Sequence, residues 1–144
     1  MRRKDTVFDD AAWQKIPVPA YWEDCGFKDL DGTAWYRTTV RIPEKLTKNK
    51  LILMLGKIND VDEVYFNGHQ IGKTGEFPSG DKRAQAQGTQ NIERAYFIPG
   101  YIINEGQANT IAVRVHDVIN KGGIYAGPIG ITTREKFMQY QRRK

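Results

Sequence analysis

The sequence predicts an all-β fold in which antiparallel strands form a β-sandwich. Short stretches of strand-forming residues recur along the 144 residues, and glycine, proline or asparagine separates each stretch from the next. No internal segment shows the spacing of an amphipathic helix. Hydrophobic residues make up 40% of the chain, which is enough for one core. A chain of this length leaves little room for a second domain, so we expect a single sandwich.

The clearest element is a β-hairpin that turns at Asn67-Gly68. Val64 and Phe66 are good strand formers at period-two spacing, and an Asn-Gly pair readily takes the two positive φ angles of a type I′ turn. The segment Gln70–Thr74 then returns antiparallel. The acids that stand just before this hairpin are Asp60, Asp62 and Glu63.

Other segments predict the strands that build the core. Leu51–Leu55 is apolar at every position, so we expect a central strand that is covered on both faces. Thr110–Asp117 alternates strictly, which is typical of a strand with one face in the core. Further strands are expected at Ala34–Ile42, at Ala95–Ile98, at Pro128–Ile131 and, as an edge strand closed by prolines, at Trp13–Val18.

Three of the connections between these strands are long loops. Ala20–Gly32 is rich in aspartate and glycine, and Lys121–Gly127 is rich in glycine. The polar stretch Phe77–Asn91 is long and contains two glycines, so we expect it to be mobile.

A short helix is expected at the C-terminal end. Thr132 with Glu135 resembles a capping box, which predicts a helix over Thr133–Gln141. The sandwich should then span residues 8–131. Residues 132–144 should form this short helix or a linker to a further domain.

Charge and composition argue against several classes of function. The net charge is +5, and much of the excess lies in the tails Met1–Lys4 and Gln141–Lys144, so a nucleic-acid surface is not expected. A single cysteine, Cys25, rules out an internal disulfide. No apolar run is long enough to cross a membrane. His69 and His116 stand alone, without the spacing of a transition-metal site.

The acids before the hairpin have three interpretations. Asp60, Asp62 and Glu63 could supply a carboxylate pair for glycoside hydrolysis, or oxygen ligands for a structural calcium. They could instead shape the loop by accepting hydrogen bonds from nearby backbone N–H groups. No nucleophile–base pair accompanies them, so we expect no catalysis by this chain alone.

Aromatic residues make up 11% of the chain, and they serve either core packing or recognition. The rings that fall within predicted strands, and that we expect to pack in the core or on a sheet, are Trp13, Trp35 and Tyr36. A ring in a loop is freer to stack on the face of a sugar. The rings that fall within predicted loops are Trp22, Phe77 and Tyr125.

A series of short motifs runs in a fixed order through residues 8–131. It comprises Phe8–Trp13, Trp35-Tyr36-Arg37, Asp62–Gly68, Tyr96–Pro99, Asn109–Val115 and Gly122-Gly123-Ile124. Each motif is short, but their order and spacing together resemble the sugar-binding domain of family 2 glycoside hydrolases such as β-galactosidases. That domain is a galactose-binding-like jelly roll.

Two of the segments are closer to related modules. Gly56–Glu63 and Gly122–Pro128 resemble the modules found beside carbohydrate esterases of the sialate O-acetylesterase type and in bacterial signalling proteins. In family 2 enzymes the catalytic acids lie in a separate barrel domain, which this sequence lacks. The resemblance therefore implies a non-catalytic accessory domain whose parent protein is a glycoside hydrolase or a carbohydrate esterase.

We therefore expect a carbohydrate-binding or accessory domain of a larger bacterial protein. That protein would be extracellular or periplasmic, with its signal peptide outside this chain. Its expected partners are a carbohydrate and a catalytic or signalling domain of the same polypeptide, without nucleic acid or membrane insertion, and no cofactor is expected beyond a structural calcium. Loops at one end of a sandwich can supply the binding groups. The candidate carbohydrate-binding residues are Trp22, Arg37, Asp60, Asp62, Arg114, Asp117 and Tyr125.

The alternative is a structural spacer or sensor module that packs on a neighbouring domain and binds no sugar. A spacer should expose a contiguous apolar patch on an outer sheet face. A binding module should instead have a polar cleft with one or two exposed rings. Arg37 and Arg114 are expected on the polar face of their strands, where they bind ligand or pair with the candidate acids.

Overall fold

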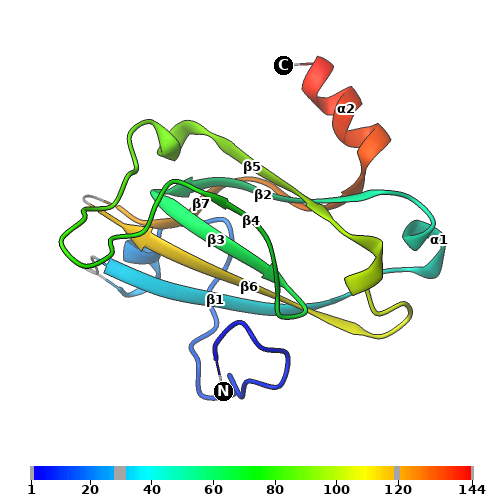
Figure 1. Cartoon of the computed structure of the whole chain (residues 1–144), viewed down its shortest axis with the longest axis horizontal. Coiled ribbons are helices and arrows are strands. Elements are labelled where there is room, and N and C mark those ends of the chain that lie inside the picture. Colours follow the sequence, from blue (N-terminus) through cyan, green and yellow to red (C-terminus); the bar gives the residue numbers. More distant parts are fainter. Residues whose placement is uncertain (1, 28–31, 119–120, 144) are drawn as a thin grey trace.

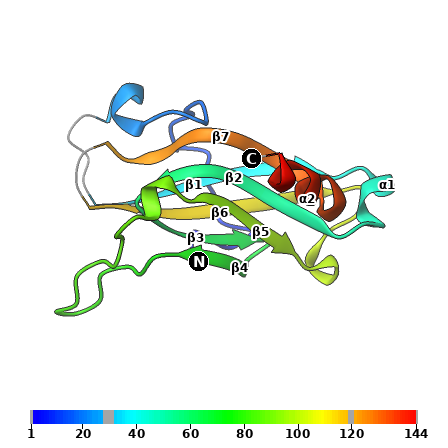
Figure 2. The same ribbon diagram turned by 90° about the horizontal axis from the view of Figure 1, so that it is seen from above.

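Two antiparallel β-sheets pack face to face in the computed structural model, which describes residues 2–27, 32–118 and 121–143 (Figures 1 and 2). The four-stranded sheet has the order β1 (Gly32–Arg41), β6 (Ala108–Asp117), β3 (Val61–Phe66) and β4 (His69–Thr74). The three-stranded sheet has the order β5 (Glu93–Ile98), β2 (Leu51–Asn59) and β7 (Gly123–Thr133). The predicted all-β sandwich is confirmed.

The core lies between the sheets and is built by strand alternation. Leu51, Leu53 and Leu55 of β2 point into it from the three-stranded sheet. The four-stranded sheet contributes the buried side chains Val64, Phe66, Ile111, Val113 and Val115 to the same core. β2 lies between β5 and β7, and both of its faces are covered along Leu51–Leu55, so the predicted central strand is confirmed.

The predicted hairpin is also confirmed. β3 pairs with β4 antiparallel, with Val64 opposite Gly72 and Phe66 opposite His69. Both turn residues have positive φ angles, 49° at Asn67 and 82° at Gly68, as a type I′ turn requires. Residues 50–75, all of which the structure describes, contain no helix.

The predicted edge strand at Trp13–Val18 is wrong, because residues 2–21 contain no strand. Pro17 and Pro19 are two residues apart, so they would face the same neighbour in a strand and would remove two successive hydrogen-bond donors. The N-terminal segment instead runs beyond β1 in turns and bends (Figure 1). It rejoins the sandwich where the Ala20 N–H donates to the Ile124 carbonyl at 2.8 Å.

The last strand begins earlier than the sequence predicts. β7 starts at Gly123 rather than Pro128, so most of the predicted loop Lys121–Gly127 is strand. Its first residues pair with the end of β2, where bulges interrupt the register on both sides of Lys57. Gly56 has a φ of +60°, and a Cβ there would lie 1.8 Å from the Ala126 carbonyl oxygen. Only glycine allows the two strands to come this close at the bulge.

Helices occupy short connections and the C-terminal end. The helix α1 (Glu44–Thr47), which the sequence analysis did not predict, is a single turn between β1 and β2. Single 3₁₀ turns form at Trp22–Cys25, Thr89–Asn91 and Gly100–Ile102. None of the helices in the described residues is long and apolar enough to cross a membrane.

The predicted C-terminal helix is confirmed as α2 (Arg134–Arg142), but its predicted cap is wrong by one residue. Thr133, not Thr132, is the N-cap, and its hydroxyl accepts a hydrogen bond from the Lys136 N–H at 3.2 Å. Glu135 therefore falls one position short of a capping box. The helix lies against the three-stranded sheet, where the Tyr140 hydroxyl contacts the Glu93 carboxylate at 3.0 Å.

Candidate functional site

The outer face of the four-stranded sheet carries most of the polar and aromatic side chains that could meet a ligand. Val64 and Val113 point into the core, so alternation turns their neighbours Glu63, Tyr65 and Arg114 outward. The strand register then aligns one row of side chains across the whole sheet. This row consists of Trp35, Arg114, Glu63 and Lys73.

Arg114 is held in this row by two neighbours. Its guanidinium forms an ion pair with the Glu63 carboxylate, at 3.0 Å. The same guanidinium lies 4.0 Å from the centre of the Phe77 ring, which is a cation–π contact. Phe77 also packs 6.0 Å from His116, measured between the ring centres. The first residue of the predicted mobile loop is thus in contact with the sheet.

Trp35, the member of this row on β1, also contacts the hairpin. Its ring centre is 5.8 Å from that of Tyr65, across the small and fully buried Ala112 of β6. Lys4 reaches Tyr65 from the N-terminal segment, with its ammonium 5.5 Å from the ring centre. The same ammonium donates to the Gly68 carbonyl at 3.0 Å. The aromatic pair is therefore covered on one side by the N-terminal segment.

Arg37 ties the N-terminal segment to β1. Its guanidinium forms an ion pair with Asp10 at 2.9 Å and donates to the backbone carbonyls of Arg3 and Phe8. It also lies 5.3 Å from the centre of the Phe8 ring, and Phe8 in turn packs edge-on against Trp13 at 5.5 Å. These contacts bring Arg3 and Trp13 to the outer face of the sheet.

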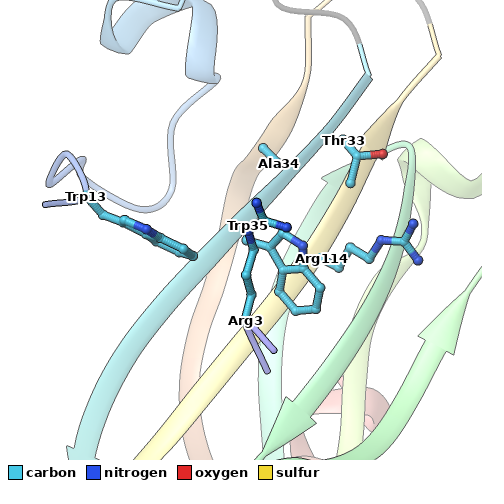
Figure 3. Close-up of a pocket in the computed structure, with 6 residues that line it drawn as sticks. All are labelled: Arg3, Trp13, Thr33, Ala34, Trp35 and Arg114. Atoms are coloured by element: carbon cyan, nitrogen blue, oxygen red, sulfur yellow. The ribbon is translucent and has the colours of Figure 1, made fainter. Parts of the chain in front are cut away.

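The result is a pocket of about 410 Å³ on this face, which we call the tryptophan pocket (Figure 3). It is lined by Arg3, Trp13, Thr33, Ala34, Trp35 and Arg114. Figure 3 shows Trp13 on one side of β1 and the Trp35 ring on the other, with Arg114 extending from β6. No acidic side chain is among the described residues that line the tryptophan pocket.

A larger groove adjoins the tryptophan pocket and shares Trp13, Ala34 and Trp35 with it. This groove has a volume of about 1240 Å³ and passes around β1 toward β7. Its floor is apolar, with side chains that include Leu53, Leu55, Ile111, Val113, Ile124 and Ile131. The N-terminal segment contributes Ile16 and Val18 to its rim.

The structure divides the seven predicted site residues into separate places. Arg37 and Arg114 lie on the outer face of the four-stranded sheet, as their strand alternation predicts, but they pair with Asp10 and Glu63. Neither arginine forms the ion pair with Asp60, Asp62 or Asp117 that the sequence analysis gave as an alternative to ligand binding. Those acids, Asp60, Asp62 and Asp117, are all buried. The seven residues do not converge on one loop cluster.

Asp62 belongs to a buried network that joins the two sheets. Its carboxylate accepts hydrogen bonds from Arg94 and from the Tyr96 hydroxyl, each at 2.6 Å, and both residues lie on β5 of the opposite sheet. The remaining guanidinium nitrogens of Arg94 donate to backbone carbonyls, including that of Asp60 at 2.7 Å. Asp62 and Arg94 both have fully buried side chains. A sugar hydroxyl cannot reach this carboxylate without breaking the network.

Burial governs the protonation of this network. It raises the pKa of the Asp62 carboxyl above its ordinary value, against the opposing charge of Arg94 and the hydrogen bond from Tyr96. Burial also raises the pKa of the Tyr96 hydroxyl, and the neighbouring Asp62 carboxylate raises it further. Asp60 has a structural contact as well, because its carboxylate accepts from the Val118 N–H at 2.8 Å. Of the three acids before the hairpin, only Asp60 accepts from a backbone N–H, as the loop-shaping interpretation expects, whereas Asp62 and Glu63 contact the side chains of other strands.

Trp22 and Tyr125 also differ from their expected settings. Trp22 is only 2% exposed and belongs to the core cluster, so its ring has no open face for stacking on a sugar. Tyr125 lies in β7 rather than in a loop. Its ring stacks on Tyr21 at 4.8 Å, and its hydroxyl donates to the Gln90 carbonyl. The half-exposed rings that the tryptophan pocket offers are Trp13 and Trp35, which the sequence analysis assigned to packing.

The sequence held a signal for one of the overlooked residues. Trp35 alternates with Tyr36 and shares the outward face of its strand with Arg37, so an aromatic ring on a polar face was predictable. Arg3, Trp13 and Arg94 gave no such signal, since their positions depend on contacts with distant segments. Among the described residues, no group of three or more histidine, cysteine, aspartate or glutamate side chains could hold a metal ion.

Comparison with known proteins identifies the fold. No protein-family model and no curated protein matches the sequence. A β-glucuronidase of Bacteroides uniformis matches 86% of this chain with 25% identity and a TM-score of 0.67. A β-glucuronidase from glycoside hydrolase family 2 matches 84% with 21% identity and a TM-score of 0.67. The Ruminococcus gnavus β-glucuronidase matches 73% with 23% identity and a TM-score of 0.57.

This chain is similar to one small part of these β-glucuronidases. It spans 15% of the length of the first two enzymes and 16% of the third. Such coverage is consistent with an accessory domain of a glycoside hydrolase. The resemblance to family 2 enzymes predicted from the sequence motifs is therefore supported at the level of the fold.

Proposed function

We propose that this chain is a non-catalytic, carbohydrate-binding domain of a larger glycoside hydrolase, with a galactose-binding-like jelly-roll fold. The observation that carries the binding function is the tryptophan pocket. Two half-exposed tryptophans flank polar side chains on an outer sheet face, and this pairing matches the two kinds of surface that a sugar presents. The similarity to part of several β-glucuronidases supports a glycoside hydrolase as the parent protein.

The proposed site differs from the loop cluster expected from the sequence. The buried contacts of Asp60, Asp62 and Trp22 favour a structural role for all three. Arg114 is the one predicted binding residue that also lines the tryptophan pocket. A pocket of about 410 Å³ is of a size suited to one sugar ring.

Titration calorimetry with methyl glycosides tests this function. A small site with one or two stacked rings should bind with a dissociation constant of roughly 0.1–1 mM, or about −4 to −5.5 kcal/mol. Trp13→Ala and Trp35→Ala should each abolish the heat of binding while the thermal unfolding midpoint shows that the variant is folded. Tyr101→Ala is the matched control, since this ring is 88% exposed and does not line the pocket. No heat with galactosides, glucosides, glucuronides or sialosides would reject the proposal.

A second candidate function is packing against a neighbouring domain, and a separate observation favours it. Leu51 and Leu53 point into the core, so Ile52 and Met54 face outward from the three-stranded sheet. Their partners on β5 are Phe97 and Ala95, so this outer face is apolar, although Ile52 and Met54 themselves are each covered to 9% exposure. Phe97 is 47% exposed, and Met138 of the adjacent helix α2 is 46% exposed. This is the kind of patch expected of a spacer.

Hydrogen exchange distinguishes packing from an unpartnered face. The amides of β5 and α2 should exchange more slowly in the complete parent polypeptide than in this chain alone if the apolar face is covered there. The amides of β1 and β6 provide the internal reference, because they lie in the other sheet. Equal exchange of β5 in both proteins would argue against the packing function and leave the binding function unaffected.

A further inference from the structure

We propose that the ligand of the tryptophan pocket is an acidic sugar, one that carries a carboxylate on its ring. This inference rests on the proposed binding function and specifies its ligand. It follows from the charges that line the pocket and from the side chains that already neutralise them.

The lining of the pocket carries an uncompensated positive charge. Of its two arginines, Arg114 is paired with Glu63 at 3.0 Å. The guanidinium of Arg3 has no hydrogen-bond or ion-pair partner among the residues that the structure describes, although its backbone carbonyl accepts from Arg37. No described acidic side chain lines the pocket to balance this charge. Arg3 is exposed, so water solvates its guanidinium in the free protein, and a carboxylate on the sugar would add the anionic partner that a neutral sugar does not offer.

The position of Arg3 suits recognition of a carboxylate. Arg3 and Trp35 line the same pocket (Figure 3), so a sugar ring stacked on this tryptophan would have the Arg3 side chain within the same pocket. A guanidinium matches the two oxygens of a carboxylate with two parallel N–H donors. Arg114 pairs with Glu63 through one terminal nitrogen, so it keeps further N–H donors. The hydroxyl of Thr33 adds a neutral partner, although it already contacts His116 at 2.9 Å.

A pair of sugars that differ only in the carboxylate tests this inference. Methyl β-glucuronide carries a carboxylate where methyl β-glucoside carries a CH₂OH group. Titration calorimetry should give the glucuronide about tenfold tighter binding, the ratio expected from one charge-assisted hydrogen bond. The preference should shrink at 1 M salt, because the contact is electrostatic and partly exposed. Methyl α-sialoside, whose carboxylate is attached differently, reports whether the site accepts acidic sugars in general.

Two neighbouring arginines provide matched variants. Arg3→Gln should abolish the preference for the glucuronide and leave weak binding of the glucoside. Arg2→Gln changes the net charge equally but does not line the pocket, so it should retain the preference. Equal binding of both sugars by the unmodified chain, or a preference that survives Arg3→Gln, overturns the acidic-sugar inference while sugar binding stands. Absence of binding to all three glycosides overturns the acidic-sugar inference, and the proposed binding function itself is rejected when galactosides also give no heat.

Discussion

Arg94 and Asp62 form an ion pair of 2.6 Å that joins the two sheets, and both side chains are completely buried. Arg94 lies on β5 and Asp62 on β3, so the pair crosses the interior of the sandwich. Every guanidinium nitrogen of Arg94 donates to an oxygen, either of Asp62 or of the backbone. The Tyr96 hydroxyl and Thr74 extend the network to β4, with 2.6 Å between these two hydroxyl oxygens.

Removal of one partner of this pair should destabilise the fold strongly. Asp62→Ala leaves the Arg94 guanidinium buried without its counter-charge, so we expect a loss of about 3–5 kcal/mol in the free energy of unfolding, measured with urea. The double variant Asp62→Leu with Arg94→Met removes both charges and should be less destabilised than Asp62→Ala alone. Lys121→Ala is the control, because it breaks an exposed ion pair with Asp24, and it should leave the urea midpoint of unfolding unchanged. A neutral effect of Asp62→Ala would show that the network is dispensable.

Two glycines with positive φ separate backbone strain from steric exclusion. Gly68→Ala meets no atom closer than 4.0 Å, so it should cost only the strain of the turn, about 1–2 kcal/mol. Gly56→Ala places its Cβ 1.8 Å from a backbone oxygen that cannot move aside, so it should cost at least about 4 kcal/mol or prevent folding. Thermal and urea unfolding of both variants give the comparison. Equal costs would mean that β2 and β7 can separate at the bulge.

The free energy of unfolding should fall as the pH drops below 6.5, the ordinary pKa of a histidine side chain. Burial and the nearby Arg114 lower the pKa of His116 from its ordinary value of 6.5. As the pH falls, His116 therefore binds a proton in the unfolded chain before it does so in the folded chain. The contribution of His116 to the free energy of unfolding is complete above pH 6.5 and is lost as the pH falls through the lower pKa of the folded state. Urea midpoints between pH 7.5 and 5 should show this decline. His116→Gln should flatten it, while His69→Gln, on the exposed β4, should retain the profile of the unmodified chain.

The stretch Phe77–Asn91 should exchange its amide hydrogens in two classes. Phe77 is packed on Arg114, and the pairings of Glu76 with Gln85 and of Ser79 with Lys82 give the segment local order. Residues 80–88 lie mostly on the surface, and apart from the hydrogen-bonded amides of Lys82 and Gln85 we expect them to exchange fastest within the folded part of the chain. The amides of Leu51–Leu55 in the central strand should exchange slowest. Comparable protection in both segments would refute the predicted mobility.

The chain alone should hydrolyse neither aryl-glycosides nor aryl-acetates. Asp62 is committed to Arg94 and Tyr96, and Asp60 to the Val118 N–H, so neither carboxylate meets a substrate. Release of nitrophenol from the corresponding substrates measures the activity. Turnover that disappears in Asp62→Gln would contradict both the accessory function and the structural interpretation of this residue.

The elements that sequence reasoning predicted correctly depend on local signals. The Asn67-Gly68 turn, the unbroken apolar run of Leu51–Leu55 and the strict alternation of Thr110–Asp117 are each contained within a few residues. A turn type or a strand face follows from such a pattern, because neighbouring side chains alternate across the pleat. The same alternation correctly predicted that Arg37 and Arg114 lie on the outer face.

The elements that the tertiary structure alone decided depend on contacts between distant segments. The sequence suggests that Asp62 is a loop acid. In the structure, Arg94, which lies 32 residues later, pairs with it across the sandwich. The sequence suggests that Trp13 packs in the core or on a sheet. In the structure, the contacts of Arg37 hold the N-terminal segment across the sheet, where Trp13 and Trp35 line one pocket. Local patterns determine which side of a strand a residue faces, and they carry no information about which distant chain segment covers that side. For this reason the sequence alone determined the sandwich and most of its strands, whereas packing between distant segments decided which polar groups are buried and where a ligand can bind.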